Sequence, residues 1–454
     1  MSDSITSLFS LKDSDVEICT EELKAGIHHF RITLVNRGGR CPSCGRFTKD
    51  IKEYRTKVIR HSIFLNEQAL VHYRARRFLC PDCGKTFYED DPFSSQYCHI
   101  SDKTVGNVLK LAKDYNETFR SIARKVGLSV NEVITIFDEH VQVSRNPLST
   151  CIAIDEFYFS RKAKNKYALM ILSLDKGYVI DILESREKRK LWYYFRQIPR
   201  EERNAVRYVS IDMNENYKDV IRYCFPNASI CVDPFHVIKN ISAALNDIRL
   251  KALRHYSDNK KSDEYYLLKY QRHLLFTDTD YNEFHDVKKN HHFGYKISDS
   301  DKLDMMLAID SDLKTAYNIK EHYMMFNAKD NSPEEQREEL DIIIDKCLGT
   351  GIEELISVGR MLDHWKEEIL NSFCTYEKYV IKNNKKNWVC VRVTSGPIEG
   401  RNKIIKIILK LANGYENTAR FRNRAIYILN KREEPSDHIL PNTVKRILKR
   451  TKKG

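Results

Sequence analysis

The most regular pattern of hydrophobic positions in this chain lies between residues 147 and 236. Short apolar, β-rich runs occur at 151–154, 157–160, 167–174 and 177–183. Beyond them the pattern predicts a charged helix over 186–197, a strand over 207–211, an amphipathic helix over 217–223 and a strand over 228–232. Three strands at hairpin spacing, followed by alternating helices and strands, are the element order of a ribonuclease-H-like fold.

The segment before this core, residues 101–143, predicts three helices. Ser101 and Asn116 are suited to cap the first two, and Ser129 with Glu132 forms a capping box for the third. The short turn at 127–129 between the second and third helices is typical of a helix-turn-helix DNA-binding unit. A trihelical packing unit without DNA contacts is the alternative. The candidate DNA-binding residues here are Arg124, Lys125 and Asn131.

Two matched cysteine pairs precede the helices. Both follow the pattern C-P-x-C-G, in which the glycine permits the tight turn that points two sulfurs at one ion. With β-rich pieces at 57–65 and 69–78 between the pairs, the pattern predicts a zinc ribbon holding one structural Zn²⁺; buried thiols without metal are the alternative. The expected ligands are Cys41, Cys44, Cys80 and Cys83, with Cys98 and His99 as packing residues. Basic residues make the ribbon a candidate DNA contact: Arg74, Arg76 and Arg77.

Composition narrows the class of protein. The 454 residues carry 76 Lys and Arg against 63 Asp and Glu, a net charge of +13, which fits a polyanionic partner as well as a solvated surface. Apolar residues at 42% argue against a disordered chain. The longest apolar runs, such as 167–174, are far shorter than the roughly 20 residues of a membrane span. Because no secretory signal is visible at the start, we expect a cytoplasmic, nucleoid-associated protein whose 12 cysteines form no disulfide framework.

Three carboxylates suit metal-dependent chemistry on phosphodiesters. Asp155 and Asp212 end the first and fourth predicted strands, which lie side by side in this kind of sheet. Glu399 falls in the first turn of a predicted helix that begins at 395–397. Such carboxylates supply the hard oxygen ligands of two Mg²⁺ ions, for which Mn²⁺ is an expected substitute. Each residue alone also fits a structural role, as a turn aspartate or as a glutamate favourable to the helix dipole.

The remaining segments complete the predicted organisation, a multidomain α+β protein with an α/β ribonuclease-H-like catalytic core interrupted by a helical insertion. Helices are predicted at 303–326, from 332 and at 352–373, with Trp365 and the Met pairs at 305–306 and 324–325 as core residues. The predicted domains are an N-terminal segment 1–39, zinc ribbon 40–99, helix-turn-helix 100–146, first core part 147–236, helical insertion 237–390, final core helices 391–432 and basic tail 433–454.

Taken together and in this order, the motifs resemble those of one family. They are C-P-x-C-G twice, the three helices, A-I-D-E-F, V-S-I-D-M-N with a following Tyr217, V-D-P-F-H-V and S-G-P-I-E-G-x-N-K. From about residue 40 to 429 the chain looks like a DDE transposase of bacterial insertion sequences, in the ISL-three group. The chain has Ser395-Gly396 where the family motif usually has Asn, a departure that does not touch Glu399.

The resemblance implies Mg²⁺-dependent cleavage of double-stranded DNA at transposon ends and joining of the freed 3′-OH to target DNA. The catalytic residues would be Asp155, Asp212 and Glu399, with Asp233 as the alternative second aspartate. We expect a homodimer or larger assembly, because a mobile element has two ends, and no membrane partner. An inactive DNA-binding regulator and another ribonuclease-H-like nuclease are the competing hypotheses. The residues that would support the site are Asp233, His236 and Asn402. The candidate DNA-binding residues near Glu399 are Arg401, Lys403 and Lys406.

Overall fold

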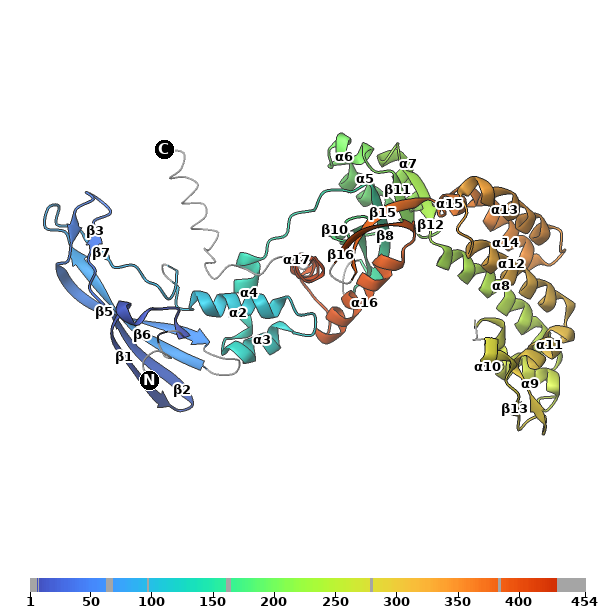
Figure 1. Cartoon of the computed structure of the whole chain (residues 1–454), viewed down its shortest axis with the longest axis horizontal. Helices are drawn as coiled ribbons and strands as arrows, with labels where there is room; N and C mark the ends of the chain where they lie inside the picture. Colours follow the sequence, from blue (N-terminus) through green and yellow to red (C-terminus); the bar gives the residue numbers. More distant parts are fainter. Residues whose placement is uncertain are drawn as a thin grey trace. The chain divides into compact units, whose positions relative to one another are not determined.

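The computed structural model describes residues 6, 8–62, 68–95, 98–160, 165–277, 281–382 and 385–430 (Figure 1). The chain divides into two compact units. One contains the described residues within Met1–Arg145, Phe159–Lys164 and Asn402–Gly454; the other contains those within Asn146–Tyr158 and Asn165–Arg401. The predicted basic tail at 433–454 lies outside the described residues.

The first unit contains a five-stranded sheet with the order β1-β2-β6-β5, in which β7 also pairs with β6. The β2–β6 pair is parallel and the others are antiparallel. Alternate residues of β6, including Val71 and Tyr73, are buried against Phe30 and Ile59 and form the core of this sheet. The elements are η1 (Asp13–Asp15), β1 (Val16–Lys24), β2 (Ile27–Leu34), β3 (Gly39–Arg40), β4 (Phe47–Thr48), β5 (Ile51–Ser62), β6 (Gln68–Leu79) and β7 (Thr86–Tyr88).

Three helices follow the sheet, as the sequence predicts: α2 (Asp102–Ala112), α3 (Phe119–Val126) and α4 (Val130–His140). Ser101 caps α2, and the Ser129–Glu132 capping box begins α4. The prediction that Asn116 caps the second helix is wrong, because Thr118 caps α3 in a box with Ser121. Gly127 joins α3 to α4 in the left-handed region at φ 68°, which glycine adopts without steric cost.

A fourth helix, α17 (Thr418–Leu429), packs on these three although it lies almost 280 residues further along the chain. The Arg424 guanidinium is buried, donates to the carbonyl of Glu117 and lies 4.6 Å from the centre of the Phe119 ring. Arg420 forms a bidentate ion pair with Asp138 on α4, with N–O distances of 2.6 to 2.9 Å. The helical module is therefore a four-helix unit whose last helix comes from the far end of the described chain.

The second unit is built on a five-stranded sheet with the order β10-β9-β8-β11-β12. β8, β9 and β10 are antiparallel neighbours, whereas β8, β11 and β12 run parallel. The order agrees with the sequence prediction, except that β8 continues past Asp155 and a short helix, α6, was not predicted. The elements are β8 (Cys151–Tyr158), β9 (Tyr167–Ser173), β10 (Val179–Leu183), α5 (Lys188–Arg196), α6 (Arg200–Asn204), β11 (Tyr208–Ile211), α7 (Glu215–Cys224) and β12 (Ser229–Val232).

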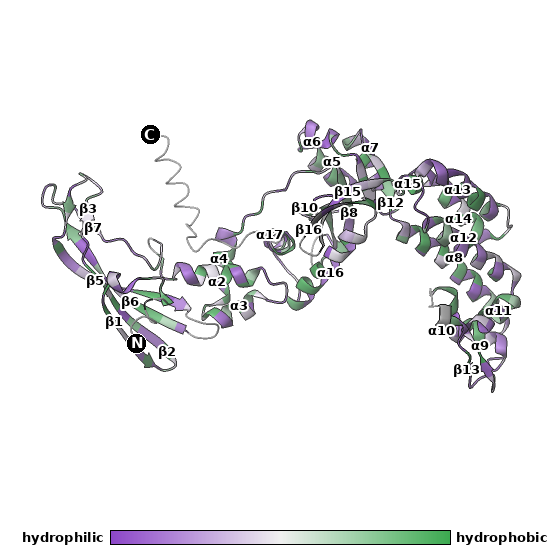
Figure 2. Cartoon of the chain, in the orientation of Figure 1, coloured by the Kyte–Doolittle hydropathy of each residue, from purple (hydrophilic) through white to green (hydrophobic). Residues whose placement is uncertain are grey.

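The predicted helical insertion follows β12 and shares one hydrophobic core with the sheet. In it α8 packs against α12 and α14, and Figure 2 shows hydrophobic and hydrophilic residues alternating around these helices. Its described helices and strands are α8 (Pro234–His255), α9 (Asp263–Tyr270), η2 (Arg272–Leu275), α10 (Tyr281–His285), β13 (Lys288–Lys289), β14 (Lys296–Ile297), α11 (Asp299–Ile309), α12 (Ser311–Asn327), α13 (Pro333–Leu348), α14 (Glu353–His364), α15 (Lys366–Asn371), β15 (Thr375–Lys382) and β16 (Lys385–Arg392). The next helix, α16 (Gly396–Leu411), begins in the second unit, and its residues from Asn402 onward belong to the first.

Four details of the insertion differ from the prediction. The helix predicted over 303–326 is two helices, because Asp310 adopts an extended conformation and caps α12. The helix predicted over 352–373 is also two helices, α14 and α15, which Trp365 separates. The β15–β16 hairpin replaces part of the region predicted to be helical. Trp365 and Met306 are buried as predicted, whereas Met325 is 65% exposed and is not a core residue. No helix among the described residues is long and apolar enough to cross a membrane.

Candidate active site and zinc centre

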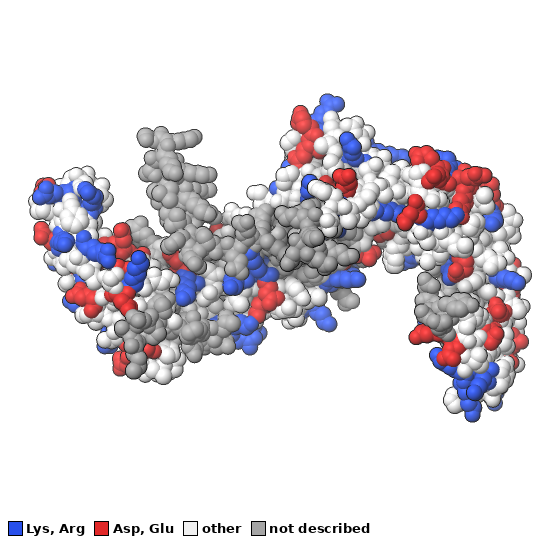
Figure 3. All heavy atoms as spheres, viewed as in Figure 1, with Lys and Arg blue, Asp and Glu red and all other residues white. Residues whose placement is uncertain are grey.

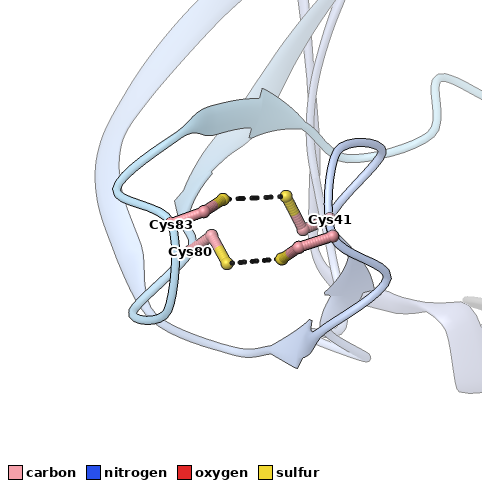
Figure 4. A group of neighbouring side chains, drawn as sticks. Cys41, Cys80 and Cys83 are labelled. Atoms are coloured by element: carbon pink, nitrogen blue, oxygen red, sulfur yellow. Dashed lines mark hydrogen bonds between the residues drawn. The ribbon is translucent and has the colours of Figure 1, made fainter.

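The two cysteine pairs form turns with the same backbone geometry. In the first, the amide of Gly45 donates to the carbonyl of Cys41 at 2.8 Å; in the second, the amide of Gly84 donates to that of Cys80 at 2.9 Å. Both glycines have positive φ angles, 75° and 68°. The C-P-x-C-G repeat therefore specifies two equivalent turns, each of which points its sulfurs toward the other (Figure 4).

The four sulfurs converge on one point. The Sγ atoms of Cys41 and Cys83 are 3.6 Å apart, those of Cys44 and Cys80 are 3.4 Å apart, and all four lie within 4.8 Å of one another. Zn–S bonds of about 2.3 Å in a tetrahedron require sulfurs roughly 3.8 Å apart, so the donor set fits one zinc ion. Backbone amides of Cys44 and Ser43 lower the pKa of the Cys41 thiol to about 7, whereas the neighbouring Cys80 thiol and burial raise the pKa of Cys44.

Cys98 and His99, the neighbouring candidates for packing roles, are not part of this cluster. The carbonyl of Cys98 accepts a hydrogen bond from Ser94 Oγ at 3.2 Å, and His99 Nδ1 lies 3.3 Å from the carbonyl of Val58. Among the described residues, the four cysteines are the group whose ligand atoms come this close together. The carboxylates of Asp155, Asp212 and Glu399 are spaced more widely.

The register of three parallel strands aligns the candidate catalytic aspartates. Ser210 of β11 pairs with Ala153 of β8, and Ile211 pairs with Val232 of β12. Continuing this register sets Asp155, Asp212 and Asp233 level with one another across three adjacent strands. Asp212 and Asp233 directly follow β11 and β12, and Asp155 lies within β8 just beyond its last pair with β11.

His236 and Asp233 lie beside Asp212 at this edge of the sheet. His236 Nε2 is 2.8 Å from Asp212 Oδ1, and this contact raises the pKa of the imidazole despite its partial burial. The Asp233 side chain, 5% exposed, caps α8 by accepting a hydrogen bond from the amide of Phe235 at 3.2 Å. Burial raises the pKa of Asp233, and the charges of Glu399 and Asp212 add to this effect.

A buried hydrogen bond ties the Glu399 helix to the strand that precedes Asp212. Ser395 Oγ and Ser210 Oγ are 2.9 Å apart, and both side chains are almost fully buried. The amide of Glu399 donates to the carbonyl of Ser395 at 3.1 Å, so Glu399 stands one turn into α16 from this link. Neither serine was recognised as a site residue in the sequence, although both lie in the motifs that contain the carboxylates.

A second network joins the neighbours of Asp155 and Asp212. The carboxylate of Glu156 accepts from Arg186 Nη1 at 2.8 and 2.7 Å and from the Tyr217 hydroxyl at 3.1 Å. Tyr217 is buried, and its burial together with the charge of Glu156 raises the pKa of the phenol, which stays a donor. The motif D-M-N-x-x-Y in the sequence contains Tyr217, but its partner Glu156 is evident only in the fold.

The candidate DNA-binding residues differ in accessibility. Arg76 is 1% exposed and lies between Glu17 and Glu89, so its charge is neutralised inside the fold, and Arg77 pairs with Glu53 at 2.8 Å. Lys125 forms an ion pair with Glu117, and Arg401 donates to the carbonyl of Gly177 at 3.0 Å. Asn402, predicted to be a supporting residue, is buried. The exposed candidates are Arg74, Arg124, Asn131, Lys403 and Lys406.

Figure 3 shows the charge distribution on one face of the molecule. Lys and Arg are interspersed with Asp and Glu over the described parts, and no single basic face dominates this view. On this face, the charges of the described residues do not single out one DNA-binding surface.

Comparisons with known proteins identify a family that this chain resembles. The profile of a family described as transposase matches residues 152–425, and that of the zinc-finger of transposase IS204/IS1001/IS1096/IS1165 matches residues 37–83. The transposase for insertion sequence element IS1001 of Bordetella parapertussis is 25% identical over 202 residues, 44% of this chain and 49% of that protein. The transposase for insertion sequence element IS1557 of Mycobacterium tuberculosis is 28% identical over 136 residues, 30% of each chain.

The matched regions thus cover about half of the first relative and less of the second. The transposase profile covers more than half of this chain and includes every candidate carboxylate. The zinc-ribbon profile ends at Cys83 and spans the four cysteines that converge in the structure. On this evidence, the chain belongs to the ISL-three group of insertion-sequence transposases.

Proposed function

We propose that this chain binds the ends of an insertion sequence, cleaves DNA by two-metal phosphoryl transfer and joins the 3′-OH ends to target DNA. The proposal depends mainly on one observation: the strand register aligns Asp155 and Asp212 on the adjacent parallel strands β8 and β11. Glu399 lies on a helix that is hydrogen-bonded to β11. The strand order β10-β9-β8-β11-β12, with its antiparallel and parallel halves, supports a ribonuclease-H-like core. Active-site carboxylates at one edge of such a sheet suit phosphodiester chemistry.

The proposed roles follow from the contacts of each side chain. Asp155, Asp212 and Glu399 supply the hard carboxylate oxygens that Mg²⁺ prefers. Their wide spacing is compatible with two metal ions, because no single ion then has to bind all three carboxylates. Mg²⁺, when bound, would activate the attacking oxygen and stabilise the leaving oxygen. His236 orients the carboxylate of Asp212 through its 2.8 Å contact. Glu156 and Tyr217 are positioning residues, which hold the strand around Asp155 against α7.

DNA binding is proposed for the zinc ribbon and for the helix-turn-helix formed by α3, Gly127 and α4. Arg124 and Asn131 are exposed on these helices, and Arg74 is exposed on the ribbon sheet, 3.9 Å from the centre of the Tyr54 ring. Cations in such positions are available to contact phosphates. Because an element has two ends, the active form is proposed to be a dimer or a larger assembly.

The choice between Asp212 and Asp233 as second catalytic aspartate is testable by amide substitution. We expect Asp212→Asn to abolish cleavage of DNA carrying the element's ends in Mg²⁺ or Mn²⁺, whereas Asp233→Asn keeps measurable cleavage. Asparagine caps helices as well as aspartate does, so the latter change preserves the start of α8 and removes only charge. The measurement is the rate of strand nicking at fixed protein and metal concentration. If Asp233→Asn abolished cleavage and Asp212→Asn did not, Asp233 would be the second catalytic aspartate.

Removing the Tyr217 hydroxyl tests the positioning network. Tyr217→Phe is expected to slow cleavage about tenfold with unchanged DNA affinity, because losing a hydrogen bond to a charged group costs on the order of 1.4 kcal/mol. Tyr178→Phe is the matched control, since its hydroxyl donates to the carbonyl of Pro147 at 3.0 Å, away from the aspartates. Equal cleavage rates for Tyr217→Phe and the unchanged protein would rule out the positioning role.

A further inference from the structure

Helix α5 carries two kinds of side chain on its outer surface. Its sequence, KRKLWYYFR, buries Leu191 and Phe195 in the core of the second unit. Counting by helical neighbours, Lys188, Trp192 and Arg196 form one row at spacing i, i+4. Arg189 and Tyr193 form the adjacent row. Cations therefore alternate with aromatic rings along the outer side of this helix.

The aromatic rings continue from α5 onto the neighbouring helix α7. The ring centroids of Trp192 and Tyr223 are 5.9 Å apart, and the Arg196 guanidinium lies 5.3 Å from the first and 5.9 Å from the second. These rings remain accessible, with Trp192 37%, Tyr193 64% and Tyr223 58% exposed. Single exposed aromatic residues are ordinary, but here two neighbouring rings share one arginine, and the exposed Tyr193 lies next to Trp192 in the same helix.

The charges of α5 indicate what this surface binds. The helix Lys188–Arg196 contains four cations and no acid. Two of them have partners, Lys188 with Asp219 and Lys190 with Glu187, but each of these side chains is about half exposed. Exposed ion pairs of this kind contribute little and are readily exchanged for another anion. A second copy of the same surface would bring cations against cations, which disfavours self-association through it.

We infer that this surface binds single-stranded DNA, whose phosphates pair with the cations while its unstacked bases lie on the aromatic rings. Alternating cations and exposed rings are the features by which proteins bind single strands without reading their sequence. The inference rests on the proposed function, because it takes DNA to be the anionic partner of the chain. It adds a binding site away from the sheet edge that carries the three aspartates. The proposed reaction itself produces such a ligand, because DNA cleavage frees a single strand. The surface consists of Lys188, Arg189, Trp192, Tyr193, Arg196 and Tyr223.

Trp192 provides a direct reporter for the test. The protein has three tryptophans, of which Trp365 is buried and Trp388 is 63% exposed, so a Trp388→Phe background leaves Trp192 as the accessible one. Titrating this zinc-loaded full-length protein with single-stranded oligothymidylate is expected to quench its fluorescence. Trp192→Ala with Tyr223→Ala should weaken binding of the oligonucleotide at least about fivefold, measured by anisotropy of labelled DNA. Arg196→Gln should lower the magnitude of the salt-dependence slope by about 0.7.

Two matched controls separate this surface from general effects. Phe276→Ala removes an aromatic side chain of equal exposure, 37%, and Arg360→Gln removes an exposed arginine from α14; both should bind the oligonucleotide like the parent. Unchanged binding by the Trp192→Ala/Tyr223→Ala variant would overturn the inference. So would a loss of self-association in that variant by sedimentation, because the occupant would then be a second copy. None of these measurements depends on DNA cleavage, so they test the single-strand surface separately from the proposed reaction.

Discussion

Replacing Asp155 by Asn is expected to reduce DNA cleavage to the background rate while DNA binding survives. The substitution keeps the shape of the side chain and removes its charge, so β8 and its pairing with β9 should be unaffected. Metal ions stabilise the charge of a phosphoryl-transfer transition state by several kcal/mol. A loss of about 4 kcal/mol corresponds to a rate lower by roughly a thousandfold. Binding should persist or tighten, because one negative charge near the DNA phosphates is removed.

The experiment compares nicking of DNA carrying the element's ends with binding of the same DNA. Asp175→Asn is the matched control: Asp175 lies in the turn between β9 and β10, where its carboxylate accepts from Thr150 Oγ1 at 3.0 Å and Ser173 Oγ at 2.9 Å. This variant loses a carboxylate from the opposite edge of the same sheet and should cut normally. Normal cutting by Asp155→Asn would show that the core is wrongly assigned. Binding without cutting by the unchanged protein would favour the competing regulator hypothesis.

The pattern of strands in the core could be predicted because each strand is a short apolar run bounded by turn residues or acids. Asp212 and Asp233 end their strands as expected. Asp155 does not, because pairing with β9 continues through Asp155 and Glu156 to Tyr158, an extension that depends on the partner strand rather than on local hydrophobicity. The sequence therefore indicates where the carboxylates lie along the chain, whereas their alignment across adjacent strands depends on the register of strand pairing.

The N-terminal strands and α17 show what local patterns cannot predict. β1 has the sequence VEICTEELK and is largely exposed, so it lacks the alternation by which a half-buried strand is recognised. The helix of α17 is evident in its sequence, but its place beside α2–α4 depends on long-range contacts such as Arg420 with Asp138. That contact also neutralises an acidic side chain of α4.

Three residues beside the candidate carboxylates could not be recognised from the sequence. Ser210, Ser395 and Glu156 form hydrogen bonds with partners 61 to 185 positions away. Such pairs form because buried polar groups must find partners, which is a property of the packed structure. Short-range patterns identify candidate ligands; the partners that orient them follow from topology.

Replacing Cys41 and Cys44 together by Ser is expected to reduce bound zinc from about one ion per chain to none, as measured by metal analysis of the purified protein. The change removes two of four thiolates, and a serine hydroxyl does not replace a thiolate as a zinc ligand. Structural zinc contributes roughly 10–16 kcal/mol in zinc-finger peptides, more than the two-residue pairing of β3 with β4 can offset. The turns at Cys41–Gly45 and Cys80–Gly84 should therefore lose their order.

The damage should remain local, because β2, β5 and β6 have a hydrophobic core of their own that includes Phe30, Ile59 and Tyr73. Amide hydrogen exchange is expected to accelerate in β3, β4 and β7, while α2–α4 keep their protection. Cys98→Ser is the matched control, since it makes the same chemical change close in sequence but outside the sulfur cluster and should retain the metal. Zinc retained by the double variant would exclude the four-cysteine site. Loss of protection throughout the first unit would instead show that the metal supports the whole sheet.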